Sequence, residues 1–433
     1  MRNALKALGT AIAIIALCAP LILWPAEDPQ TSLAGAPGVT LTVPATVIVS
    51  TTVPASQTTT TTEPAPEPPP TTTTTTVPTP LTVTVAIAGD VITDEAVMTS
   101  ARDPETGAYD FGPIFAPIAP YLREVDYTVA CLEPCLAGPE YGYTDSPVFN
   151  APRELAFALR TIGVDLVATA NRHSYDFGQQ GVIGTLDRLE AAGLSHVGTY
   201  RSWGERVTPR VVDIRGLRVA FLNYTDRLGR ASALAQEATP AVAMVDLGAI
   251  RQDVKMARVW GADAVVVILD YGEPLAPAPT EEQTALTREI LSFGVDAIVG
   301  TRPAVQTIAH IVTYSSWQVT DKYVAYSLGD LISGNRQESP GHGFILYLHL
   351  KKDGLRTFLT GVGYLPVYVQ SVTGDKGSAF RVLPVVPGLE SDSDLPLSEE
   401  DRRRMADIWE DLRGLLYRPD ENISPFVAGG SNR

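Results

Sequence analysis

The stretch that decides the fold is Asn171-Arg172-His173-Ser174-Tyr175-Asp176-Phe177-Gly178, which directly follows the apolar run at residues 164–170. A run of this length is typical of a buried strand, and it ends in an amide, an imidazole and a carboxylate. Open α/β folds build their sites at the carboxyl ends of such strands. We therefore expect these polar residues to belong to a site.

The same pattern recurs along the chain, because six further apolar runs end in polar residues. The residues that follow those runs are Gly89-Asp90, Glu133, Asn223, Asp270-Tyr271-Gly272-Glu273, Thr301-Arg302-Pro303 and Gly329-Asp330. A single polar residue after a strand is common in loops and does not by itself indicate a site. Seven in one chain predict that the polar side chains share a rim.

Predicted helices alternate with these strands, at residues 154–162, 186–192, 247–260 and 284–293. Three of them stop at a glycine that is followed two residues later by an aspartate, namely Gly163, Gly261 and Gly294. Glycine accepts the left-handed backbone that ends a helix. The alternation predicts a layered α/β domain with a buried sheet.

After Asp330 the pattern changes to short alternating strands at residues 343–350, 356–361, 364–369 and 381–386. We expect these strands to form or complete a second sheet. A final helix is predicted to begin at Ser398, where Asp401 three residues on completes a pair that resembles a capping box.

The N-terminal segments have a different composition. Arg2 and Lys6 precede a charge-free apolar run at residues 7–26, which is typical of a secretory signal or a membrane anchor. The bulky residues around Trp24 make a poor cleavage site and favour the anchor. The Thr/Pro-rich segment that follows cannot bury a core, so it is predicted to be a disordered tether.

These observations divide the chain into five predicted parts. They are a signal peptide or membrane anchor (1–27), a disordered linker (28–80), the α/β domain (81–389), a C-terminal helix (390–418) and a flexible tail (419–433). The formal net charge of −16 argues against nucleic acid as a partner. Together the segments predict an exported, extracytoplasmic protein that is anchored in the membrane or associated with the cell wall.

The cysteines exclude a disulfide-rich scaffold, because the 433 residues contain only 3 of them. Cys131 and Cys135 lie four residues apart. They could close a small disulfide loop in an oxidising compartment or remain two buried thiols. His196, His310, His342 and His349 have no matching partner and are expected to be structural or exposed.

These blocks together resemble the poly-γ-glutamate capsule biosynthesis family, also called the CapA-like family, over residues 82–372. The resemblance rests on Gly89-Asp90-Val91, Leu132-Glu133, Ala170 to Gly178, residues 181–189, Tyr271-Gly272-Glu273 and Tyr326-Ser327-Leu328-Gly329-Asp330. It implies a layered α/β/β/α sandwich of the calcineurin-like metallophosphoesterase kind, with two mixed sheets flanked by helices.

The resemblance also implies roles for the strand-end residues. Asp90, Glu133, Asn171 and, at the end of a later strand, Asp270 stand at the positions of metal ligands. His173 stands at the position of the residue that protonates a leaving group or stabilises the transition state. Two-metal sites of this kind polarise a phosphoryl or acyl group and activate a water.

The second half of the implied site departs from the family pattern. The family has histidine where this chain has Asp270, and its Gly-His-His-Pro-His block is Gly300-Thr301-Arg302-Pro303-Ala304 here. Arg172 likewise replaces an asparagine. Two guanidinium groups repel divalent cations and attract anions. The sequence therefore leaves two alternatives, an oxygen-ligated site for Mn²⁺, Mg²⁺ or Ca²⁺, or no metal at all.

Arg172, Arg302 and Glu273 are consequently predicted to contact substrate. The competing interpretation is that the arginines are consumed by ion pairs with Glu133 and Asp270. We interpret the chain as a CapA-like envelope or capsule protein with a degenerate metal site that binds an anionic envelope polymer or a capsule-synthesis complex. The alternative is an active metal-dependent hydrolase of phosphoester or amide bonds in envelope polymers.

Overall fold

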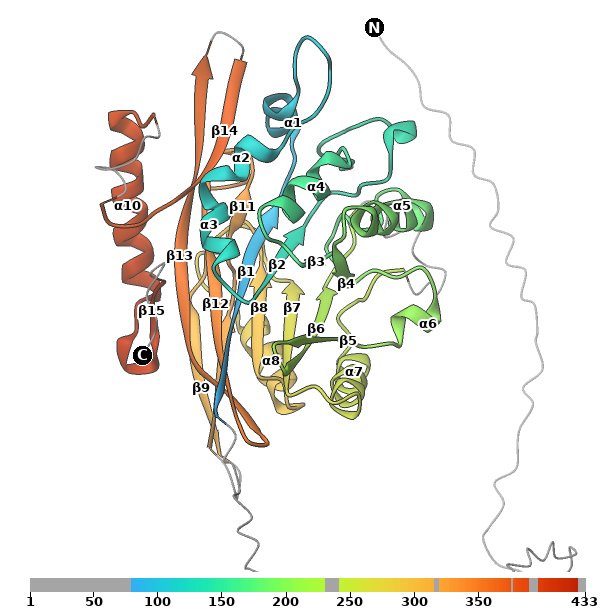
Figure 1. The fold of residues 1–433 in the computed structure, drawn as a ribbon, viewed down its shortest axis with the longest axis vertical. Coiled ribbons are helices and arrows are strands. Elements are labelled where there is room, and N and C mark those ends of the chain that lie inside the picture. Colours follow the sequence, from blue (N-terminus) through green and yellow to red (C-terminus); the bar gives the residue numbers. More distant parts are fainter. Residues whose placement is uncertain (1–78, 230–240, 315–318, 375–376, 389–395, 427–433) are drawn as a thin grey trace, which may run out of the picture. The chain divides into compact units, whose positions relative to one another are not determined.

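The computed structural model describes residues 79–229, 241–314, 319–374, 377–388 and 396–426. The predicted signal or anchor, all but the last two residues of the predicted linker, and the end of the predicted tail lie outside the described residues. Within the described residues the chain forms two β-sheets with helices on their outer faces (Figure 1).

The first sheet has nine strands. They are β1 (Leu81–Val91), β2 (Tyr127–Leu132), β3 (Leu166–Ala168), β4 (Ser195–Val197), β11 (Asp330–Ile332), β12 (His342–Asp353), β13 (Arg356–Gly374), β14 (Gly377–Pro384) and β15 (Ile423–Pro425). The main path runs β14-β13-β12-β1-β2-β3-β4, while β11 pairs with β1 and β15 with β13. β1 to β4 are parallel, β12, β13 and β14 are antiparallel to their neighbours on the main path, and the two pairings off it are parallel.

The second sheet has six strands. They are β5 (Arg210–Ile214), β6 (Leu217–Thr225), β7 (Ala264–Asp270), β8 (Ala297–Thr301), β9 (Ile308–Tyr314) and β10 (Val319–Ala325). Their order is β5-β6-β7-β8-β10-β9. β6, β7, β8 and β10 are parallel, and the two edge strands are antiparallel. Both sheets are therefore mixed.

Helices pack against the outer faces of both sheets, except that the last one packs on the core between the sheets. They are α1 (Glu95–Ala101), α2 (Gly112–Phe115), α3 (Ala119–Arg123), α4 (Glu154–Thr161), α5 (Gly178–Ala191), α6 (Trp203–Arg206), α7 (Leu247–Val259), α8 (Glu281–Ser292) and α10 (Glu399–Leu416). Short 3₁₀ turns lie at Ala116–Ile118, Pro139–Tyr141 and Pro419–Glu421.

The alternation of side chains along the strands explains the layers. Val85 and Ile87 of β1 pack between the two sheets, whereas Ala86 and Ala88 face the core beneath α1 to α5. The outer face of the second sheet packs in the same way against α7 and α8. Successive side chains of a strand point to opposite faces, so each sheet separates two cores. This layering confirms the predicted α/β sandwich of two mixed sheets flanked by helices.

The C-terminal strands differ from the prediction. They extend the sheet that β1 to β4 begin, because β12 pairs with β1 over residues 81–87, so the prediction of a second sheet was wrong. The two runs at residues 356–361 and 364–369 also merge into the single strand β13. Local alternation identifies strands, but it carries no information about which distant strand each one joins.

The three predicted helix-stopping glycines are confirmed. Gly163, Gly261 and Gly294 have φ values of 107°, 83° and 97°. In each case the aspartate two residues later accepts a backbone N–H from the start of the neighbouring strand. Those contacts run from Thr128 N to Asp165, from Arg218 N to Asp263 and from Val265 N to Asp296, at 3.0, 2.8 and 2.7 Å. The repeated device thus ends a helix and fixes the next strand.

The predicted cap of the final helix is also present. Ser398 and Asp401 form a capping box at the start of α10, and Asp401 additionally accepts hydrogen bonds from Tyr368 and Gln370 of β13. We expect Ser398→Ala to lower the free energy of unfolding by about 1 kcal/mol, because an orphan helix N–H loses its acceptor. Denaturant unfolding followed by circular dichroism measures this.

Ser292→Ala is the matched control, since the Ser292 hydroxyl donates to Glu289 O at the far end of α8 and caps no helix start. Its effect should stay within about 0.5 kcal/mol. Equal losses in the two variants would contradict a specific role for the cap.

Candidate functional site

The structure brings the strand-end residues of both sheets to one place. Asp90 lies at the end of β1, Glu133 directly follows β2, Asp270 ends β7, and Arg302 directly follows β8. All four are buried, with exposed fractions of 2–6%. They meet because these strands are parallel within each sheet and end at the same edge.

Arg302 is the centre of this cluster. Its Nη1 lies 3.3 Å from Asp270 Oδ1, and its Nη2 lies 3.1 Å from Asp226 Oδ1. Its Nε donates to the carbonyl oxygen of Tyr271 at 3.3 Å. The predicted Arg302–Asp270 ion pair is therefore confirmed. The guanidinium is 5% exposed and is engaged in these internal contacts.

Asp270 has partners on both of its oxygens. Oδ2 accepts hydrogen bonds from the Thr225 hydroxyl at 2.8 Å and from the backbone N–H of Arg172 at 2.9 Å, and Oδ1 faces Arg302. Burial raises the pKa of Asp270 to about 6, although the charge of Arg302 opposes the rise. Asp270 also ties the two sheets together, since Arg172 follows a strand of the first sheet.

Glu133, Arg172 and His173 form a second group beside the first. Arg172 Nε lies 3.4 Å and His173 Nε2 lies 3.9 Å from Glu133 Oε1. The other imidazole nitrogen, Nδ1, is 2.8 Å from Asp176 Oδ2, and the ring lies edge-on to Phe149. The imidazole is thus held in one orientation, with Nε2 turned towards Glu133.

Asn171 is fully engaged by the backbone around it. Its Nδ2 donates to Leu132 O at 2.6 Å, and its Oδ1 accepts the N–H of His173 at 2.8 Å. The amide therefore joins the ends of two strands and shapes the turn that carries His173. Cys135 supports the same turn, because its Sγ donates to the carbonyl oxygen of His173 at 3.3 Å.

Asp330 adds a buried carboxylate to the cluster. It is aligned with Asp90 across the pairing of β1 and β11, and it is 0% exposed. Neither of its oxygens makes a hydrogen bond of good geometry, although the nearby Ser339 hydroxyl lowers the pKa of Asp330 against the effect of burial. Burial raises the pKa of Asp330 to about 7, and it also raises the pKa of Asp90, with further contributions from Glu133 and Asp330.

Two of the residues that the resemblance implies as metal ligands are engaged in hydrogen bonds within the protein. The oxygens of Asp270 and the amide of Asn171 already have partners, and a buried guanidinium stands among the carboxylates. The described residues hold no group of three or more His, Cys, Asp or Glu side chains that could bind a metal ion. Arg302 instead supplies positive charge at this place.

A pocket of about 460 Å³ opens beside the second group. Its charged lining residues are Asp94, Glu95, Glu133, Asp145, Glu338 and Arg172. Asp94 is occupied by the backbone N–H groups of Gly334 and Asn335. Among the described lining residues Arg172 is the single basic one, so it is where an anionic group would be recognised.

Two further predictions concern Glu273 and the pair of cysteines. Glu273 is exposed on a loop and pairs with Arg227, which in turn contacts Asp226, so Glu273 lies at the periphery of the cluster. Cys131 and Cys135 are both free and buried. Of the two alternatives for this pair, the structure therefore has the buried thiols.

The sequence did not single out Asp226 or Thr225, although both contact the cluster. The apolar run of β6 was predicted to stop at Asn223, but the strand continues to Thr225. Asn223 is consequently inside the strand, where its Oδ1 accepts the N–H of Ala170 at 2.6 Å and links the two sheets. The aspartate that follows the true strand end was the missed signal.

Comparison with known families decides where the chain belongs. Residues 84–335, well over half of the chain, match the family described as bacterial capsule synthesis protein PGA_cap. The chain belongs to this family. The resemblance to this family is therefore confirmed, and the residues of the strand-end cluster, from Asp90 to Asp330, all lie within the matched region.

Two relatives carry related names. The capsule biosynthesis protein CapA of Bacillus anthracis is 26% identical over 252 residues, which cover 56% of this chain and 58% of that protein. The PGA biosynthesis protein CapA of Bacillus subtilis is 26% identical over 298 residues, which cover 68% and 76%. The chain thus spans less than two thirds of the length of the first relative.

Solved structures give looser likenesses. A calcineurin-like phosphoesterase, YfkN of Bacillus subtilis, has a TM-score of 0.37 at 12% identity, with 77% of this chain and 98% of that chain covered. The sulfate thiohydrolase SoxB of Thermus thermophilus has a TM-score of 0.32 at 13% identity, with 67% and 44% covered. The sheet topology described above, rather than these superpositions, establishes the sandwich. None of the described helices is long and apolar enough to cross a membrane.

Proposed function

We propose that this member of the capsule synthesis family works without the family's two-metal centre and binds an anionic envelope polymer. The observation that carries the proposal is the buried guanidinium of Arg302, which contacts Asp270 and Asp226 where the resemblance implies metal. A guanidinium neutralises carboxylates, but it cannot activate a water as a divalent ion does.

Arg172 is the residue we propose for contact with the polymer. Its side chain is 32% exposed, and only its Nε is used, in the pair with Glu133. No described residue accepts a hydrogen bond from its two terminal nitrogens. A guanidinium offers paired donors that match a carboxylate or phosphate group, and Arg172 presents such donors at the pocket.

The acidic lining of the pocket restricts how a polyanion would bind. Glu95, Asp145 and Glu338 would repel a chain of closely spaced negative charges laid across the pocket. The lining therefore favours entry of one acidic unit, such as a chain end, with its charged group against Arg172. We propose recognition of the polymer through single acidic units.

Calorimetric titration with polyglutamate, and separately with inorganic phosphate, tests this proposal in the presence of a chelator. We expect binding that Arg172→Ala weakens about tenfold or more, because a charge-assisted hydrogen bond is lost. Truncation to alanine keeps the backbone N–H that Asp270 accepts. Binding should also weaken as ionic strength rises.

Arg153→Ala is the matched control, since Arg153 is an exposed arginine whose ion pair is with the adjacent Glu154. It should leave the affinity unchanged. Thermal unfolding of both variants separates lost binding from lost folding. Absence of binding at low salt, or binding that Arg172→Ala does not alter, would overturn the proposal.

The alternative of an active metal-dependent hydrolase makes the opposite prediction. With Mn²⁺ and a generic phosphodiester substrate we expect no turnover above background, because the buried guanidinium of Arg302 already pairs with Asp270 and Asp226 and its charge repels a divalent cation. Efficient turnover that Asp90→Ala abolishes would show that the hydrolase interpretation is correct.

A further inference from the structure

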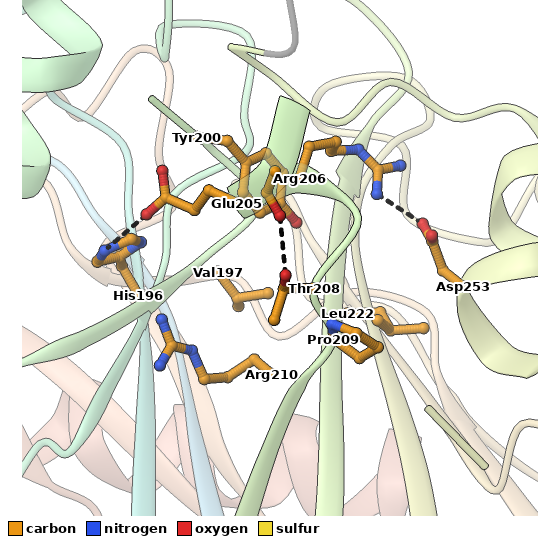
Figure 2. Close-up of a pocket in the computed structure, with 11 residues that line it drawn as sticks. His196, Val197, Tyr200, Glu205, Arg206, Thr208, Pro209, Arg210, Leu222 and Asp253 are labelled. Atoms are coloured by element: carbon orange, nitrogen blue, oxygen red, sulfur yellow. Dashed lines mark hydrogen bonds and ion pairs between the residues drawn. The ribbon is translucent and has the colours of Figure 1, made fainter. Parts of the chain in front are cut away.

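A second cavity, of about 320 Å³, lies away from the strand-end cluster. It is formed where β4, the edge of the first sheet, comes near β5 and β6 of the second, and α6 and α7 complete its walls (Figure 2). Nothing in the function proposed above uses it. Its size suits a small molecule rather than a polymer, since ligand sites of this kind start at roughly 300 Å³.

Part of the wall is apolar or aromatic. Val197, Leu222 and Pro209 contribute aliphatic surface, and the Tyr200 ring lies beneath the guanidinium of Arg206 at 5.4 Å. Such a surface accommodates a compact organic body, while the few polar groups in the cavity decide which molecule binds.

The carboxylates of the cavity are already paired. Asp253 accepts from Arg206 Nη1 and from the Tyr224 hydroxyl, both at 2.8 Å. Glu205 Oε1 lies 3.1 Å from Arg201 Nη1. The cavity therefore offers no free negative charge among the described residues that line it.

Arg210 is left with unmatched positive charge. It is exposed at the cavity, and no described residue forms an ion pair or hydrogen bond with its guanidinium. Figure 2 shows its side chain on the same side of the cavity as His196. Burial lowers the pKa of His196, and the positive charge of Arg210 lowers it further.

His196 supplies a hydrogen-bond acceptor. Its Nε2 lies 3.1 Å from Glu190 Oε1, and a carboxylate only accepts, so the ring proton belongs on Nε2. The other nitrogen, Nδ1, is then an acceptor. It is buried and has no hydrogen-bond partner, although buried polar atoms normally have one.

We propose that this cavity binds a small organic anion whose carboxylate or phosphate contacts Arg210 and whose hydroxyl or amino group donates to His196 Nδ1. The two unmet groups require opposite features of one molecule, an anionic end and a nearby donor. Hydroxy acids, amino acids and sugar phosphates share this chemistry.

Three isosteric probes separate the two requirements in a calorimetric titration of the full chain. 3-Hydroxybenzoate has both groups, benzoate lacks the donor, and 3-hydroxybenzamide lacks the charge. We expect affinity in that order, with about a tenfold loss for benzoate and a larger loss for the amide, because charge-assisted hydrogen bonds are the stronger ones. Glucose 6-phosphate tests whether a phosphate replaces the carboxylate.

Arg210→Ala should weaken 3-hydroxybenzoate about tenfold or more, and Arg403→Ala should not, since Arg403 is an exposed arginine of α10 at the opposite side of the molecule (Figure 1). The Nδ1 resonance of His196 in ¹⁵N-labelled protein should shift with 3-hydroxybenzoate and stay in place with benzoate.

Equal affinity for all three probes, no binding of any of them, or binding that Arg210→Ala leaves unchanged would overturn the proposal. Because Arg172 takes no part in this cavity, Arg172→Ala should not affect these titrations. Failure here would therefore leave the polymer-binding proposal intact, and the reverse also holds.

Discussion

Replacing Arg302 with methionine should lower the free energy of unfolding by about 3–5 kcal/mol, because the change removes one partner of a buried ion cluster. Asp270 would keep its hydrogen bonds from Thr225 and Arg172 but lose its counter-charge, and Asp226 would lose a contact of 3.1 Å. Methionine is apolar and, although shorter, of broadly similar volume, so the loss reports charge more than volume. Denaturant unfolding at pH 7.5 measures it.

Two further variants make this prediction specific. Arg251→Met removes an exposed ion pair with Glu289 and should cost less than about 1 kcal/mol. Adding Asp270→Asn to Arg302→Met should recover part of the loss, because the uncompensated carboxylate is gone. Similar losses for Arg302→Met and Arg251→Met would mean that Arg302 does not hold the cluster together.

The Arg302→Met variant also tests whether the guanidinium takes the place of a metal ion. Without the guanidinium, Asp270 and Asp226 lose their cation, and Asp90 loses a nearby opposite charge. Mn²⁺ should therefore raise the unfolding temperature of Arg302→Met more than that of the unchanged protein. An equal effect of Mn²⁺ on both proteins would contradict the view that Arg302 occupies the place of a metal.

The strand-end rule predicted much of this cluster from the sequence. Asp90, Glu133, Asp270 and Arg302 each follow an apolar run, and parallel strands bring such ends together wherever the runs lie in the chain. The Arg302–Asp270 pair was also predictable, since opposite charges at neighbouring strand ends attract. The position of a residue after an apolar run and the sign of its charge were sufficient for these predictions, because both can be read from the local sequence.

Other parts of the site depend on information that is not local. Asp226 was missed because β6 continues through the polar residues Asn223 and Thr225, which find partners on the other sheet and in the cluster. The cavity at His196 combines residues of five elements, and these residues form no sequence motif. Which sheet receives β12 is likewise decided by pairing with β1, more than 250 residues away in the chain.

Asp330→Asn should stabilise the fold at pH 8 by roughly 2–4 kcal/mol. The pKa of Asp330 is raised to about 7 by burial, whereas an aspartate in the unfolded chain titrates near 4. Between these values the folded state holds a proton that the unfolded state has lost. Stability of the unchanged protein should therefore fall as pH rises from about 4 to about 7 and level off above that range.

The asparagine variant lacks this titration, so its advantage should be largest at pH 8 and should vanish towards pH 4. Unfolding curves recorded between these limits, with chelator present, give the difference directly. Asp407→Asn, which changes an exposed aspartate of α10, should show no such pH-dependent advantage. If Asp330 were instead held ionised by a bound cation, the substitution would destabilise the protein at pH 8 when chelator is omitted. That outcome would contradict both the predicted direction and the guanidinium-centred site from which it follows.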